Sequence, residues 1–200
     1  ESRAVRSTRV CGKVRGVGFS QGSVRPDLNA PTGIVCCTTG PWANSIFISD
    51  SRDRVMIFGS EWLEPRMCIG RTGSAPGNFR SPAGLAVHEK RQLLIVCDKG
   101  NNRVQIFSLG EGTGTCPLMN TFGSGEDAKA DSSNEGVKLI APRCVCIGPN
   151  DALFVADGGG EETSRILAVT HAGVPLQSVT FRGFAAGLTL TADYAHLLVA

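Results

Sequence analysis

An aspartate followed a few residues later by an arginine recurs three times along this chain. The three pairs, called the hairpin clips below, are Asp50 with Arg54, Asp98 with Arg103, and Asp157 with Arg165. A carboxylate beside a guanidinium could take part in acid–base chemistry, or it could form an ion pair that closes a turn between two strands. A catalytic pair normally occurs once in a chain. Because this pair recurs in the same sequence context, we interpret it as structural and predict no catalytic residues.

The three histidines are the other candidates for metal binding or acid–base catalysis. His88 ends one predicted strand, His171 follows another, and His196 begins a third. These positions are not equivalent within the repeat described below, so we do not expect the three imidazoles to converge on one ion. We expect each histidine on the surface or in a loop, and we expect no bound metal and no cofactor.

Two further features resemble ligand-binding motifs without completing one. The eight cysteines include no CxxC pair and no Cys/His grouping at zinc-finger spacing. Five of them fall inside predicted strands, where a free thiol behaves as a small buried apolar group: Cys36, Cys37, Cys97, Cys144 and Cys146. The glycine-rich stretch 109–117 lacks the Gly-Lys-Ser/Thr ending of a phosphate-binding loop and no helix follows it, so it predicts a hairpin loop.

The hairpin clips lie within a repeated unit of short apolar runs, which is clearest at residues 81–107. Its runs 85–87, 93–97 and 104–107 are apolar, β-branched or aromatic, and each has the length of a strand. The turn 99–102 contains glycine and asparagine, which adopt positive φ at low cost. Similar units occupy 31–58, 142–169 and 187–200.

The apolar runs predict strands that are covered on both faces. A strand with one wet face alternates between apolar and polar side chains, but runs 93–97 and 152–156 do not. The aspartates of the three clips are 48 and then 59 residues apart, and a strand-only repeat of this period is typical of propeller blades. We therefore predict an all-β chain, a β-propeller whose four-stranded antiparallel blades stack face to face.

The repeat divides the chain into a basic leading segment, four blades and one insertion. These are the segment 1–28, blades at about 29–80 and 81–123, an acidic insertion at 124–138, a blade at about 139–182 and a partial blade at 183–200. The leading segment could end a preceding blade. An open arc would leave strand edges unpaired, which natural proteins avoid. We expect flanking sequence to supply the rest of the ring, with a second chain as the alternative.

The combination Pro-x-Gly-Leu/Ile, an apolar run ending in Asp, and Asn-Asn-Arg-Val-Gln-Ile-Phe resembles the NHL repeat. The match is close at 81–107 and good in the first blade. It is looser in the third, where Arg143 and Cys144 stand in place of an expected glycine, and partial in the fourth. The resemblance covers about residues 29–200. It implies an NHL-type propeller, a fold that typically has about six blades.

The function predicted from this fold lies in its loops. In propellers the turns between second and third strands share a face with the blade-to-blade loops. Here that loop face would carry Arg52, Arg71, Arg80, Lys99, Asn101 and Asn102. Residues 1–103 hold 15 Lys and Arg against 8 Asp and Glu, whereas residues 104–200 hold 5 against 10. We therefore predict a non-enzymatic scaffold that binds a protein partner through this mostly basic face.

Two other functions remain open. Some NHL propellers bind RNA, and the basic face of blades one and two could do so, but base stacking needs exposed aromatic rings. Trp42 and Trp62 are the only obvious candidates for stacking. The second alternative is a metalloenzyme, because peptide-amidating lyases and related six-bladed lactonases resemble NHL propellers. Those enzymes use histidines or carboxylates of the central channel, and the histidine positions in this chain argue against such a site.

The sequence also bears on the compartment. It contains no Asn-x-Ser/Thr sequon, no signal peptide opens the printed chain, and no apolar run approaches the length needed to span a membrane. These features favour a cytoplasmic protein with reduced thiols and no membrane partner.

Overall fold

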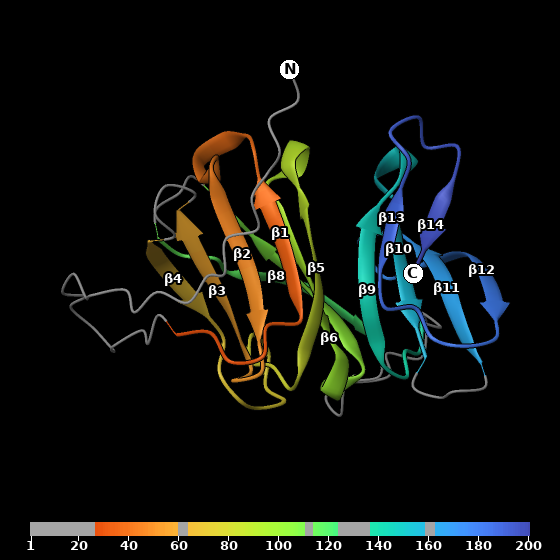
Figure 1. Cartoon of the computed structure of the whole chain (residues 1–200), viewed down its shortest axis with the longest axis horizontal. Helices are drawn as coiled ribbons and strands as arrows, with labels where there is room; N and C mark the ends of the chain where they lie inside the picture. The colour runs from red at the N-terminus through yellow and green to blue at the C-terminus, as the bar shows by residue number, and fades with distance from the viewer. Residues whose placement is uncertain (1–26, 60–63, 111–113, 124–136, 159–162) are drawn as a thin grey trace, which may run out of the picture.

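The protein is built from β-strands joined by turns and loops. The computed structural model describes residues 27–59, 64–110, 114–123, 137–158 and 163–200. Within these ranges four sheets lie side by side in an arc (Figure 1). Helical residues in the described part of the chain are confined to four 3-10 turns of three residues each. None of the described helices is long and apolar enough to cross a membrane.

Three of the sheets have four antiparallel strands and the last has two. Sheet one contains β1 (Gly33–Cys37), β2 (Ser45–Asp50), β3 (Arg54–Gly59) and β4 (Pro65–Ile69). Sheet two contains β5 (Pro82–His88), β6 (Leu93–Asp98), β7 (Arg103–Ser108) and β8 (Leu118–Gly123). Sheet three contains β9 (Pro142–Ile147), β10 (Leu153–Asp157), β11 (Ser164–Val169) and β12 (Pro175–Phe181). Sheet four contains β13 (Leu188–Leu190) and β14 (Leu197–Val199). The 3-10 turns are η1 (Gly40–Trp42), η2 (Glu89–Arg91), η3 (Lys99–Asn101) and η4 (Pro149–Asp151). The predicted all-β class and the four-stranded antiparallel sheets are confirmed.

Backbone chemistry explains where the strands begin and reverse. Proline is the first residue of β4, β5, β9 and β12, a position where it interrupts the hydrogen-bond ladder least. The reversal after η3 uses Asn102, whose φ of 55° lies in the left-handed region that asparagine tolerates. The strand expected at 85–87 is longer in the structure, because β5 begins at Pro82 and continues through a register shift to Leu85.

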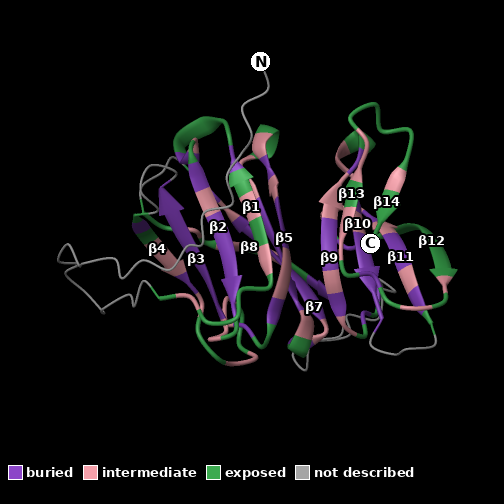
Figure 2. Cartoon of the chain, in the orientation of Figure 1, coloured by how far each residue is buried: buried purple, intermediate pink, exposed green. Residues whose placement is uncertain are grey.

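Apolar side chains pack between neighbouring sheets. The core between sheets one and two contains Phe47, Leu94 and Phe107, each no more than 1% exposed. Phe79, from the loop that joins these sheets, is 0% exposed, and its ring centroid lies 5.7 Å from that of Phe107. Buried residues concentrate in the middle strands of the four-stranded sheets (Figure 2). Strand β6 is therefore covered on both faces, which explains why its sequence does not alternate between apolar and polar residues.

A second core lies between sheets two and three. It contains Val104 and Ile106 of β7 together with Val155 of β10 and Leu167 of β11. Val137 also packs there at 9% exposure, although the sequence placed it in the insertion 124–138. Burial of the apolar Val137 side chain is favourable, so the chain returns to the core one residue before the predicted end of the insertion. Residues 124–136 of the insertion and residues 1–26 of the leading segment lie outside the described part of the chain.

Neighbouring sheets also meet through their first strands, because β1, β5, β9 and β13 contact one another in that order. A cavity of about 380 Å³ lies between these strands, with Val35, Leu85, Ile147 and Leu190 among its lining residues. The outer strand of sheet three, β12, is exposed along almost all of its length (Figure 2). Among the described strands, β14 pairs only with β13.

All cysteines in the described ranges are free thiols. Cys37, Cys97 and Cys144 are buried, as expected, and burial raises the pKa of the Cys97 thiol well above its ordinary value. Cys36 is exposed, contrary to the expectation for a residue inside a strand. The reason is the alternation of β1, which buries Cys37 in the core and turns its neighbour to the opposite face.

Candidate interaction surface

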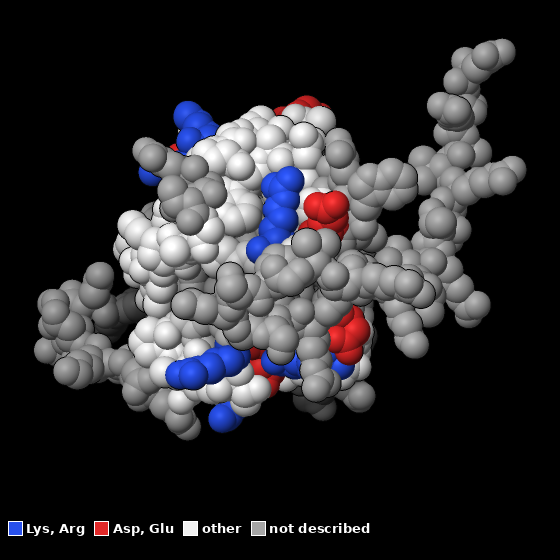
Figure 3. All heavy atoms as spheres, turned by 90° about the vertical axis from the view of Figure 1, so that its left-hand side faces the viewer, with Lys and Arg blue, Asp and Glu red and all other residues white. Residues whose placement is uncertain are grey.

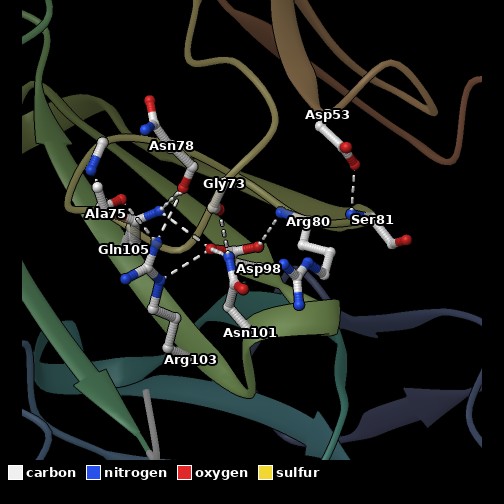
Figure 4. A network of polar contacts seen from close by, with 11 residues as sticks. Asp53, Gly73, Ala75, Asn78, Arg80, Ser81, Asp98, Asn101, Arg103 and Gln105 are labelled. Atoms are coloured by element: carbon white, nitrogen blue, oxygen red, sulfur yellow. Dashed lines mark hydrogen bonds and ion pairs between the residues drawn. The ribbon is translucent and has the colours of Figure 1, made fainter. Parts of the chain in front are cut away.

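Asp98 forms a buried polar hub at the end of β6 (Figure 4). Its Oδ1 accepts a hydrogen bond from the backbone N–H of Arg80 at 2.8 Å. Its Oδ2 accepts from Asn101 Nδ2 and Arg103 Nε, both at 2.8 Å, and from Gln105 Nε2 at 3.2 Å. Burial raises the pKa of Asp98, and the donors from Arg80, Asn101 and Arg103 oppose that shift. The carboxylate therefore has both oxygens occupied by protein donors.

The other two hairpin clips repeat this arrangement. Asp50 accepts from the backbone N–H of Asn29 at 3.0 Å and lies 3.2 Å from Arg54 Nη2. Asp157 accepts from two backbone N–H groups just before β9, each at 2.9 Å, and pairs with Arg165 Nη2 at 2.9 Å. Each carboxylate thus ties the end of the second strand of its sheet to the segment that leads into the first strand. An aspartate that is buried and already fully bonded is poorly placed to take a proton from a substrate.

The loop 71–80, between sheets one and two, is held by side chains of β7. Arg103 Nη2 donates to the carbonyl oxygens of Ala75 at 3.0 Å and Asn78 at 2.9 Å. Gln105 Nε2 also donates to the Asn78 carbonyl, at 2.8 Å (Figure 4). Sequence reasoning missed this role of Gln105, although a polar residue inside an otherwise apolar strand was an available signal.

Two further residues, Asp53 and Gly100, hold the ends of this loop. Asp53, in the turn after β2, accepts from Thr72 Oγ1 at 2.8 Å and from the backbone N–H of Ser81 at 2.7 Å. Gly100 donates its N–H to the Arg80 carbonyl at 2.7 Å. A Cβ at Gly100 would lie 2.6 Å from that carbonyl oxygen, so only glycine permits the close approach. Both neighbouring sheets therefore fix the conformation of loop 71–80.

Three of the six predicted binding residues have charged groups that are available to contact a binding partner. Arg71 and Arg80 are exposed on loop 71–80, and Lys99 is half-buried in η3 beside it. Their charged groups make no hydrogen bond or ion pair with any other residue of the described ranges. These three side chains are called the basic loop surface below; Arg71 and Arg80 belong to loop 71–80, whose backbone is fixed, and Lys99 belongs to the neighbouring turn η3.

The other three predicted binding residues have partners or structural positions within the protein. Arg52 Nη2 pairs with Asp27 Oδ2 at 2.8 Å. Asn101 is 9% exposed and donates to Asp98 and to the Gly73 carbonyl, the latter at 2.9 Å. Asn102 is half-buried in the left-handed turn. The side-chain amides of Asn101 and Asn102 have a structural role at the turn, because a short polar side chain can form hydrogen bonds with nearby backbone groups.

Among the described residues visible from the sheet-one side of the arc, basic side chains form separate groups and not a continuous band. Figure 3 shows the side of the arc on which sheet one lies, where Lys and Arg form separate groups and some have Asp or Glu beside them. Trp42, a predicted stacking residue, is 4% exposed, and its Nε1 donates to the Leu109 carbonyl. Its ring belongs to the core between sheets one and two. Trp62 lies outside the described residues.

The expectation for the histidines is wrong in part. His88, at the end of β5, is only 5% exposed, and its ring centroid lies 5.3 Å from that of His171. Packing of sheet two against sheet three brings His88 and His171 together. This contact could not be inferred from their positions within the repeat, because the two positions are not equivalent. His196 is exposed. No group of three or more His, Cys, Asp or Glu side chains in the described ranges is arranged to hold a metal ion.

Comparison with known proteins gives one sequence match and several structural ones. The NHL repeat family matches residues 79–107. No curated protein matches the chain. The hydrazine synthase of Kuenenia stuttgartiensis superposes with a TM-score of 0.60 and 16% identity, covering 91% of this chain and 45% of that one. A chain of a nidogen/laminin complex gives a TM-score of 0.60 and 16% identity, covering 86% and 57% respectively.

A protein from Lactobacillus plantarum gives a TM-score of 0.56 at 18% identity, covering 85% of this chain and 48% of its own. The chain thus spans about half the length of these structures. Similarity at this level of identity shows the fold alone. The sequence match and the stacked four-stranded sheets lead to one conclusion: the chain carries an NHL repeat at residues 79–107 within a fold of the β-propeller type.

Proposed function

We propose that the protein is a non-enzymatic interaction scaffold whose basic loop surface, Arg71, Arg80 and Lys99, binds an acidic segment of a protein partner. The observation that carries this proposal is the fixed conformation of loop 71–80. Asp98, Arg103 and Gln105 hold its backbone from inside, while the Arg71 and Arg80 side chains are exposed. A loop that is ordered before binding loses less conformational entropy when a partner docks.

Two observations support a non-enzymatic role. The recurrent carboxylates are occupied by protein donors, as described for Asp98. The cavity between the first strands is lined by apolar residues together with Thr189, Thr191, Cys146 and Tyr194, and no charged residue or histidine is among its described lining. A metal centre built from histidine or carboxylate ligands would need such groups.

Reversing the charge of the basic loop surface tests the proposal. The triple variant R71E/R80E/K99E should bind a short fluorescein-labelled poly-glutamate peptide at least about tenfold more weakly than the unsubstituted protein, measured by fluorescence anisotropy at low salt. Its free energy of unfolding should change by no more than about 0.5 kcal/mol, because the charged groups of these side chains have no partner in the described ranges.

Lys90 provides the matched control. It is exposed in η2, a turn separate from the basic loop surface, so Lys90→Glu should leave peptide binding unchanged. Equal binding by the triple variant and the unsubstituted protein would exclude the basic loop surface as the site. A labelled single-stranded oligouridine RNA forms the second arm. Tight, steeply salt-dependent RNA binding without peptide binding would contradict a protein scaffold and favour the RNA alternative.

A further inference from the structure

A group of titratable side chains joins sheet two to sheet three, away from the basic loop surface. It consists of His88, Arg91, Asp151 and His171, called the histidine cluster below. Arg91 Nη2 and His88 Nε2 lie 2.7 Å and 3.0 Å from the two carboxylate oxygens of Asp151. The His171 ring lies against the His88 ring at a centroid distance of 5.3 Å. A single carboxylate therefore faces one arginine and two imidazoles.

His88 lies between the backbone of Arg91 and the carboxylate of Asp151. Its Nδ1 accepts from the backbone N–H of Arg91 at 3.2 Å, so the ring proton is assigned to Nε2, which faces Asp151. This Nε2 atom is buried and lies 3.0 Å from Asp151 Oδ1. A second proton on His88 would remove the acceptor that the Arg91 N–H now uses.

His171 is the side chain least suited to carry a positive charge. Its Nε2 is buried and has no hydrogen-bond partner in the described ranges. Burial, His88 and Arg91 all lower the pKa of His171, and only Asp151 opposes them. The backbone of His171 is held in place, because Asn120 Nδ2 of β8 donates to its carbonyl at 2.6 Å. The ring therefore stays against His88 as long as the two sheets are packed together.

We propose that the histidine cluster is an acid-sensitive latch between sheets two and three, which is closed at neutral pH and opens when His171 is protonated. A protonated His171 would lie near the positive charge of Arg91, and the one carboxylate within the cluster already pairs with Arg91. Separation of the two sheets at this end exposes Nε2 of His171 to water and removes the repulsion.

The direction of the pH dependence follows from the lowered pKa. A histidine with a lowered pKa in the folded state contributes its full stability above its unfolded value of about 6.5. That stability is lost as the pH falls below about 6.5, because the open state takes up the proton first. Below both pKa values, opening becomes about tenfold more favourable for every unit by which folding lowers the pKa.

Hydrogen exchange measured by mass spectrometry at pH 7.5 and pH 5.0 tests the latch. After correction for intrinsic exchange rates, protection should fall at pH 5.0 in β9, η4 and the turn at 170–174, but not in β1–β4. His171→Gln keeps a polar side chain that does not titrate, so this variant should lose most of the pH-dependent difference. His196→Gln, which changes an exposed histidine just before β14, should keep this difference.

The titration of the unsubstituted protein tests the same proposal independently of whether any variant folds. The imidazole resonances of His171, followed by NMR, should titrate below 6.5, and Asp151→Asn should lower that midpoint further because it removes the opposing charge. A midpoint at or above 6.5 would overturn the proposal. So would an unchanged loss of protection at pH 5.0 in the His171→Gln protein.

Discussion

Replacing Asp98 by alanine is expected to lower the free energy of unfolding by about 3–5 kcal/mol, because it leaves a buried charge without its partner. Arg103 is only 3% exposed, and within the described part of the chain Asp98 is the carboxylate with which it pairs. Asn101 would also lose its side-chain acceptor, and the backbone N–H of Arg80 would lose its carboxylate. Urea unfolding monitored by circular dichroism measures the change.

Asp27 is the matched control, since it also pairs with an arginine at 2.8 Å but is 58% exposed. Water screens such a pair, so Asp27→Ala should have a far smaller effect than Asp98→Ala. If both variants lost the same stability, burial would not be what gives the hairpin clip its strength. If Asp98→Ala were as stable as the unsubstituted protein, the structural interpretation of the clips would be wrong.

Phe79→Ala should lower the free energy of unfolding by a similar amount, about 3–5 kcal/mol. The Phe79 ring is 0% exposed and fills the space between sheets one and two, beside Phe107. The space is tight on its other side, because a Cβ at Gly70 would lie 2.3 Å from the ring. Removing the ring leaves a cavity that two fixed sheets cannot close. The midpoint of urea unfolding reports the loss.

Phe184→Ala is the corresponding surface change. Its ring is 59% exposed and lies beneath the guanidinium of Arg143 at 5.6 Å, so little apolar area is lost on truncation. We expect a much smaller destabilisation than for Phe79→Ala. Equal losses, or a tolerated Phe79→Ala, would show that sheets one and two do not depend on this contact.

Much of the fold follows from local sequence. The run 93–97 has no polar alternation because β6 is buried on both faces, and it becomes a strand within one residue of its expected limits. The pairing of Asp98 with Arg103 also follows from local spacing, since they are opposite one another across one hairpin. The NHL resemblance identified the same unit, and the family match at 79–107 agrees with it.

What could not be predicted depends on contacts between units that are far apart in the sequence. The bonds from Arg103 and Gln105 to the Asn78 carbonyl need the loop to fold back over β7. Asn101 has the composition of an exposed turn residue, and only its position against Gly73 shows that it is buried. His88 and His171 meet because two sheets pack together, which no spacing within a single repeat encodes.

The backbone amide of Arg80 provides the most direct test of the central claim, that the buried Asp98 hub fixes the loop which carries the basic loop surface. This amide donates to Asp98 Oδ1 at 2.8 Å. Its hydrogen exchange should be strongly protected in the unsubstituted protein, and the Asp98→Ala variant, which removes the acceptor, should lose that protection and bind the poly-glutamate peptide more weakly. An Arg80 amide that exchanges at the rate of an unstructured peptide in the unsubstituted protein would contradict the account.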